Sequence, residues 1–116
     1  MIAEGQITLF KFPQTDMAGG KFRPALILRQ LPGDYNDWLN RMISSQLDQK
    51  ISDFDEIITS NDSDFKQSGL KLPSLIRISR IVVVSSDILL GKLGHVDAQR
   101  LLRIKQKLSC WIQGTK

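Results

Sequence analysis

The sequence contains few of the residues that form disulfides, bind metals or transfer protons near neutral pH. Its 116 residues include one cysteine, Cys110, and one histidine, His95. A single cysteine forms no disulfide within the chain, and no cluster of cysteine and histidine is present that could bind a structural zinc ion. We therefore expect no metal and no cofactor in this protein.

Long apolar stretches are also absent. No unbroken apolar run exceeds four residues, as at residues 81–84, whereas about 20 apolar residues are needed to cross a bilayer. Residues 1–5 include Glu4 and no basic residue ahead of an apolar segment, which is unlike a secretory signal. These absences predict a cytoplasmic protein with no membrane partner.

Charge is unevenly distributed along the chain, whose formal net charge is +4. Residues 1–50 carry six basic and five acidic side chains, residues 51–76 carry two and five, and residues 77–116 carry eight and two. The basic excess of the last third suits a polyanion such as nucleic acid, although a solvated helix face gives the same count. Charge alone therefore leaves both interpretations open.

The length and the apolar pattern predict one mainly β domain over residues 1–116, because 100 to 150 residues is about the commonest domain size. Apolar residues that alternate with polar ones, or that form short runs, are typical of strands. We expect strands at residues 5–12, 24–28, 37–47, 53–58 (an edge strand), 74–84 and 88–93. Residues 13–22 are expected to form a mobile loop, residues 31–34 a turn, and residues 61–68 an exposed loop or a single turn.

The last element is predicted to be a helix between Asp97, a good N-cap, and Gly114, which suits a left-handed C-terminal residue. Apolar residues recur there at steps of three and four, at Leu101, Ile104, Leu108, Trp111 and Ile112. Arg100, Arg103 and Lys107 lie on the opposite face. We expect these three to form a solvated polar face rather than a phosphate site.

The isolated candidates for chemistry have structural explanations. His95 precedes the helix and is expected to act as a turn or cap residue, since nothing aims it at a nucleophile. Cys110 lies beside Trp111 in the predicted helix and belongs to no basic or histidine-containing motif, so we expect it to be inert. The pair Gly19 and Gly20 is not followed by the Lys-Ser/Thr ending of a phosphate-binding loop, and no carboxylate pair has metal-ligand spacing. Nucleotide hydrolysis and metal catalysis therefore lose their usual support.

Arginine and hydroxyl residues at the predicted strand edges form a more coherent set. Arg23 precedes a buried strand, Ser44, Ser45 and Gln46 end another, and Arg77 lies in a third. Arginine offers a planar, permanently charged fork that matches two phosphoryl oxygens, and serine or glutamine adds neutral donors. The set suits phosphate binding, although caps of sheet edges would use the same residue types.

The order of several segments resembles the MazF/PemK toxins of bacterial type II toxin–antitoxin systems, which are small ribonucleases. The similar segments are Gly5-Gln6-Ile7, residues 21–28 (KFRPALIL), residues 42–46 (MISSQ), Gly69-Leu70, residues 73–77 (PSLIR) and Leu93-Gly94. The resemblance extends over almost the whole chain, and residues 21–28 are its most specific part.

This resemblance implies an SH3-like barrel with a C-terminal helix, a homodimer, a cognate antitoxin, and cleavage of single-stranded RNA without a metal. In such enzymes the ribose 2′-hydroxyl attacks the neighbouring phosphodiester. Arg23 matches the arginine that neutralises the charge of the phosphorane, and Ser44 matches a residue that contacts the scissile phosphate. Arg77 matches an arginine that serves as general acid or as a second charge stabiliser.

The sequence departs from the family pattern where a general base is concerned. Some members carry an aspartate two residues after the second arginine and a histidine in the loop before the first, and here these positions are Ser79 and residues 16–17. Asp16 is a candidate base, although it could equally cap its loop. We expect RNA contacts from Ser45, Gln46, Ser79 and Asp16.

A second function of a different class remains open. A toxin on the same fold can act by binding a protein, as the gyrase poison CcdB does, without cutting any bond. The paired arginines and Ser44 match the cleaving members and favour the ribonuclease.

Overall fold

The computed structural model describes residues 2–11, 22–51 and 54–114. Its helices and strands are β1 (Gln6–Lys11), β2 (Phe22–Gln30), β3 (Asp37–Ser44), β4 (Glu56–Ile58), α1 (Phe65–Ser68), β5 (Ser74–Ser85), β6 (Lys92–His95) and α2 (Ala98–Gln113). Single 3₁₀ turns follow β3 at Leu47–Gln49 and β5 at Ser86–Ile88. The mobile loop predicted at residues 13–22 lies outside the described residues, except that Phe22 begins β2.

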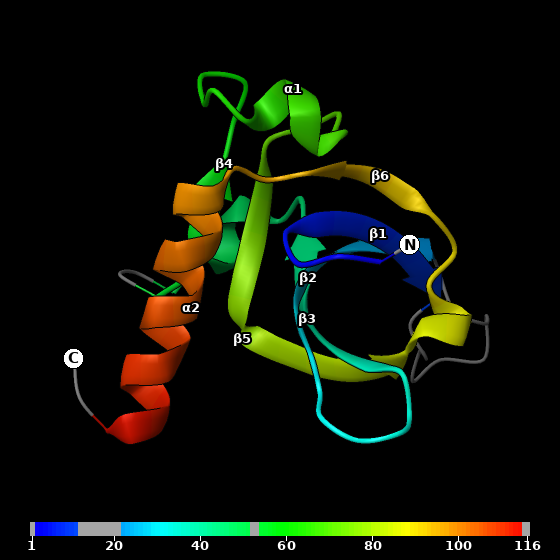
Figure 1. Cartoon of the computed structure of the whole chain (residues 1–116). Coiled ribbons are helices and arrows are strands. Elements are labelled where there is room, and N and C mark those ends of the chain that lie inside the picture. Colours follow the sequence, from blue (N-terminus) through cyan, green and yellow to red (C-terminus); the bar gives the residue numbers. More distant parts are fainter. Residues whose placement is uncertain (1, 12–21, 52–53, 115–116) are drawn as a thin grey trace, which may run out of the picture.

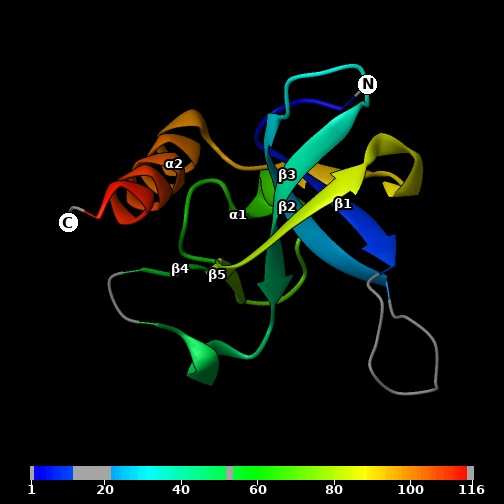
Figure 2. The same cartoon turned by 90° about the horizontal axis from the view of Figure 1, so that it is seen from below.

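The six strands form one antiparallel sheet in the order β4-β5-β3-β2-β1-β6. Figure 1 shows this sheet curling on itself, with α2 along one side and α1 beside β6, and Figure 2 shows the same arrangement from below. The predicted mainly β, barrel-like fold with a C-terminal helix is confirmed. The edge position predicted for residues 53–58 is confirmed for β4, which ends the sheet.

Side chains that alternate along the strands fill two separate apolar clusters. In β2, Leu26 and Leu28 join the larger cluster, which also contains Ile104 and Leu108 of α2. Ala25 points the other way into a smaller cluster around Phe10. Because β2 is buried on both faces, its apolar run is continuous instead of alternating.

The predicted helix is confirmed at both ends. The Oδ1 atom of Asp97 accepts a hydrogen bond from the backbone N–H of Arg100 at 2.7 Å. Gly114 has a φ of +79°, the left-handed conformation that glycine adopts at low cost. Both signals depend only on neighbouring residues, which is why the sequence predicts them well.

The end of β3 and the start of β6 differ from the prediction by several residues. β3 ends at Ser44 because its Oγ accepts a hydrogen bond from the backbone N–H of Gln46 at 3.0 Å and turns the chain. Ser85 acts similarly on Asp87, so a 3₁₀ turn replaces the start of the strand predicted at residues 88–93, and β6 begins at Lys92. Serine hydroxyls of this kind compete with the sheet for backbone groups.

The prediction of a solvated face on α2 is wrong for Arg100, which is buried. Its Nε lies 2.8 Å from Oδ2 of Asp64 and its Nη1 lies 3.0 Å from Oε1 of Glu56. Glu56 also pairs with Arg103 at 3.2 Å and with Lys107 at 3.8 Å. These five residues are called the Arg100 cluster below. The carboxylates come from the acidic segment at residues 51–76, so the charges that compensate α2 lie far away in the sequence.

The predicted single turn at residues 61–68 is present as α1, but it is not fully exposed. Asp64 and Ser68 are buried, since Asp64 pairs with Arg100 and the Oγ of Ser68 donates a hydrogen bond to the backbone carbonyl of Phe65 at 2.5 Å. The Arg100 cluster therefore fixes α1 to the start of α2.

Candidate functional site

The register of the sheet places the predicted catalytic residues on one face. Ala25 of β2 pairs with Met42 of β3, and Met42 pairs with Arg77 of β5. Paired residues and residues two apart in a strand share a face. Arg23 and Ser44 therefore lie on the same face as Arg77. This is the face opposite α2, since the neighbouring residues of β2 point toward α2.

Two of these residues meet in a pocket of about 320 Å³. Arg23 enters it from β2, and Ser44 and Ser45 enter it from the end of β3. The opposite wall is the loop between α1 and β5, residues 69–72. Arg23 and Ser44 are half-buried and Ser45 is exposed. Ile43, which belongs to the larger apolar cluster on the α2 side, also lines the pocket, so the pocket lies where both faces of the sheet contribute to it. It brings together residues that carry a guanidinium and two hydroxyl groups.

Arg77 lies beside this pocket and does not line it. Its Nη1 donates a hydrogen bond of 2.6 Å to Oε1 of Gln49, in the 3₁₀ turn after β3. Among the residues that the structure describes, its buried Nε has no hydrogen-bond partner. Gln49 therefore holds the guanidinium while leaving donors for a further acceptor, in the manner of a charge placed for a phosphate.

The remaining predicted residues have different outcomes. Gln46 does not line the pocket; its backbone N–H orients the hydroxyl of Ser44. Asp16 and the side chain of Ser79 lie outside the described residues, so their predicted RNA contacts stay predictions. The backbone of Ser79 falls where the β3–β5 pairing shifts register, between the pairs Arg41–Ile81 and Met42–Arg77.

The sequence-predicted site residues include none of the apolar residues that line the pocket and not Lys71; Phe22 and Leu72 are among these apolar residues. The sequence predicts Phe22 at the end of a loop, and Lys71 and Leu72 lie between two similar segments without belonging to either. One signal in the sequence could have identified Lys71 as a site residue: it is the single lysine in an apolar and turn-rich stretch, residues 69–73, ahead of a predicted strand. That this stretch and Arg23 line the same pocket depends on the fold.

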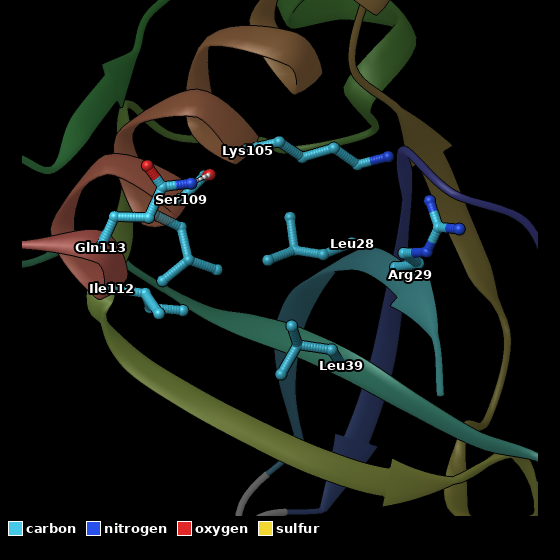
Figure 3. Close-up of a pocket in the computed structure, with 8 residues that line it drawn as sticks. Leu28, Arg29, Leu39, Lys105, Ser109, Ile112 and Gln113 are labelled. Atoms are coloured by element: carbon cyan, nitrogen blue, oxygen red, sulfur yellow. Dashed lines mark hydrogen bonds between the residues drawn. The ribbon is translucent and has the colours of Figure 1, made fainter. Parts of the chain in front are cut away.

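A second hollow, of about 460 Å³, lies on the other face, between α2 and strands β2 and β3 (Figure 3). Leu28, Leu39 and Ile112 give it an apolar lining. Lys105 and Arg29 supply cations at its edge, and Lys105 also pairs with Glu4. It contains none of the residues predicted for catalysis.

No group of three or more His, Cys, Asp or Glu side chains within residues 2–11, 22–51 and 54–114 is arranged to hold a metal ion. Over the same residues, no helix combines the length and apolar character needed to span a membrane.

The chain is similar to known proteins both in sequence and in fold. A profile of the family described as PemK-like, MazF-like toxin of type II toxin-antitoxin system matches residues 3–112. No curated protein matches the chain.

Several solved structures share the fold. A MazE-MazF complex from Deinococcus radiodurans aligns with a TM-score of 0.67 at 19% identity, covering 99% of this chain and 98% of that one. An endoribonuclease in complex with its cognate antitoxin, from a mycobacterial species, aligns with a TM-score of 0.66 at 14% identity, covering 97% and 96%. The Mycobacterium tuberculosis toxin MazF-mt6 aligns with a TM-score of 0.64 at 13% identity, covering 96% and 98%.

Proposed function

The chain belongs to the PemK-like, MazF-like toxin family of type II toxin–antitoxin systems, and we propose that it is an endoribonuclease that cleaves single-stranded RNA. One observation carries this proposal. Arg23 and Ser44 meet in one pocket, and Arg77 lies on the next strand of the same face. Among the described residues neither arginine forms an ion pair with a carboxylate, and two arginines with a hydroxyl group suit the binding of a phosphodiester.

In the proposed reaction the ribose 2′-oxygen attacks the adjacent phosphorus. The bond from O2′ to phosphorus forms and the bond from phosphorus to O5′ breaks, leaving a 2′,3′-cyclic phosphate and a 5′-hydroxyl. Arg23 stabilises the charge that the phosphoryl oxygens gain in the transition state, and the hydroxyl of Ser44 donates to one of these oxygens. Arg77 adds a second charge or gives the proton that O5′ takes up.

The base that receives the 2′-hydroxyl proton is the open position of this mechanism. Asp16 is the first candidate to test, because it precedes Arg23 by only seven positions in the sequence and its carboxylate can accept a proton. Loss of turnover in Asp16→Asn, with RNA binding retained, would support this role.

The proposed partners follow from the family. We infer a homodimer that acts on RNA in the cytoplasm, and a cognate antitoxin whose acidic segment folds over the catalytic face and competes with RNA for its positive potential. A stable antitoxin complex that retained full ribonuclease activity would exclude inhibition by occlusion.

The proposed activity is tested by incubating the purified protein with an RNA library that contains all short words, in excess EDTA, and mapping the new ends. Cleavage that leaves cyclic phosphate and 5′-hydroxyl ends is expected. If the RNA stays intact while expression still arrests growth, the protein acts by binding a partner instead.

A further inference from the structure

Two large apolar side chains in the catalytic pocket are exposed to solvent. Phe22 is 61% exposed and Leu72 is 60% exposed, and both line the pocket that holds Arg23 and Ser44. Phe22 directly precedes Arg23 in β2 and therefore lies on the other face of that strand, although both residues line the pocket. Leu72 comes from the loop between α1 and β5. The pocket therefore presents apolar surface on two of its walls, next to the groups proposed to bind phosphate.

The wall that carries Leu72 is fixed before any ligand binds. A Cβ atom at Gly69 would lie 2.2 Å from the carbonyl oxygen of Leu93, and one at Gly94 would lie 2.1 Å from that of Gln67. The backbones of α1 and β6 are thus in direct contact, as only glycine allows. At the other end of the loop, the Oγ of Ser74 donates a hydrogen bond of 2.8 Å to the carbonyl of Leu72.

A cation stands beside this apolar surface. Lys71 lines the same pocket and is exposed. In the part of the chain that the structure describes, Lys71 forms no ion pair. An aromatic side chain beside unpaired cations is the arrangement by which proteins bind single-stranded nucleic acid, since bases stack on the ring and cations contact the backbone.

We propose that this pocket holds one unstacked nucleobase of the RNA substrate, stacked on Phe22 and packed against Leu72, with Lys71 at a phosphate next to the scissile one. The inference rests on the proposed ribonuclease function and adds a base-binding role to three residues. Stacking alone accepts any base. Phe22 therefore sets the position of the strand, so that the phosphate beside the held base reaches Arg23 and Ser44.

The test uses a fluorescent RNA that contains a mapped cleavage site, made resistant to cleavage by a 2′-deoxy sugar at that site. Binding is measured for wild type, Phe22→Ala, Phe22→Trp and Lys71→Ala. Matched controls are Tyr35→Ala, an aromatic residue that is 81% exposed and lies outside the pocket, and Arg29→Ala in the hollow of Figure 3. Thermal unfolding checks that each variant is folded.

Phe22→Ala is expected to weaken binding about 10- to 100-fold, from the usual loss of one base stack, and Phe22→Trp is expected to restore it. Lys71→Ala is expected to weaken binding and to reduce its salt dependence by about one phosphate contact. Tyr35→Ala and Arg29→Ala are expected to bind like wild type.

A second measurement locates the base. Abasic sugars are placed one at a time at the nucleotides around the cleavage site. At one position the abasic sugar should weaken binding to wild type as much as the Phe22→Ala substitution weakens binding of the intact RNA. The same abasic RNA should bind Phe22→Ala no more weakly than the intact RNA does. If Phe22→Ala binds intact RNA as tightly as Tyr35→Ala does, the base subsite is wrong while the ribonuclease function stands. If wild type neither binds nor cleaves RNA, both proposals fall.

Discussion

Arg100 and Arg41 are both buried in this protein, but of the two only Arg100 is paired with carboxylates of the described residues. Arg100 is 5% exposed and reaches carboxylate oxygens of Glu56 and Asp64 within 3.0 Å. Arg41, in β3, is 0% exposed, and its Nε, Nη1 and Nη2 atoms have no hydrogen-bond partner. Burial lowers the pKa of Arg41 to about 10, although the nearby charge of Asp55 partly opposes this change.

The difference shows that the role of an arginine here depends on the carboxylates around it. Burial alone would lower the pKa of Arg100, but the hydrogen bond and charge of Asp64, together with the charges of Glu56 and Asp62, raise the pKa above its ordinary value. Among the described residues, Arg23 and Arg77 have no carboxylate within ion-pair distance. Their charge is left for a ligand, while that of Arg100 is used in the fold.

Removing the charge of Arg100 should have the largest effect on stability. Arg100→Met leaves Glu56 and Asp64 buried without their main counter-charge, so we expect a loss of about 3 to 5 kcal/mol in the free energy of unfolding. Urea denaturation measures this loss. Arg29→Met, at an exposed position, is the control and should change stability by less than about 0.5 kcal/mol. Equal effects of the two substitutions would show that the Arg100 cluster does not stabilise the fold.

Substitution of the arginines on the catalytic face should affect rate and not stability. Arg23→Ala and Arg77→Ala are each expected to lower the cleavage rate about 10² to 10³-fold, as loss of a transition-state donor does. Arg23→Lys should recover only part of the rate, because a point charge does not reproduce the planar fork. Single-turnover cleavage and urea denaturation measure the two quantities. Undiminished cleavage by both alanine variants would reject the proposed site.

Arg41 should respond in the opposite sense to Arg100. Arg41→Met replaces a buried guanidinium that has no hydrogen bonds with an apolar side chain of similar length, so we expect a gain of about 1 to 2 kcal/mol in the free energy of unfolding. Urea denaturation alongside Arg100→Met tests this contrast directly. A loss of stability instead would mean that the attraction between Arg41 and Asp55 exceeds the cost of burying the charge.

The smallest effect is expected from pH, through Asp64. Burial raises the pKa of Asp64. The hydrogen bonds from Arg100 and from the backbone N–H of Asp97, together with the charge of Arg100, lower this pKa by a larger amount, so it lies below its ordinary value of 3.8. This contribution to stability is present above pH 4 or so and is lost as the pH falls through the lowered pKa. Denaturation curves from pH 7 to pH 3 should show less loss in Asp64→Asn than in wild type.

The face that carries Arg23, Ser44 and Arg77 could be predicted in part from the sequence. Their residue types, their places at strand edges and the family pattern single out these three residues, and the register brings them to one face. Their neighbours could not be chosen in this way. Gln49 holds Arg77 across 28 positions of sequence, and Lys71 lines the same pocket as Arg23 only because the sheet curls and the α1–β5 loop closes the pocket.

What the sequence by itself determined is local. The period of apolar residues sets the strands, and Asp97 and Gly114 set the ends of α2, because these signals act between residues a few positions apart. Tertiary structure decided which charges are neutralised. A polar stripe on α2 has the same pattern whether water or Glu56 and Asp64 lie against it, and only the packing of α2 against β4 and α1 turns Arg100 into a buried structural ion.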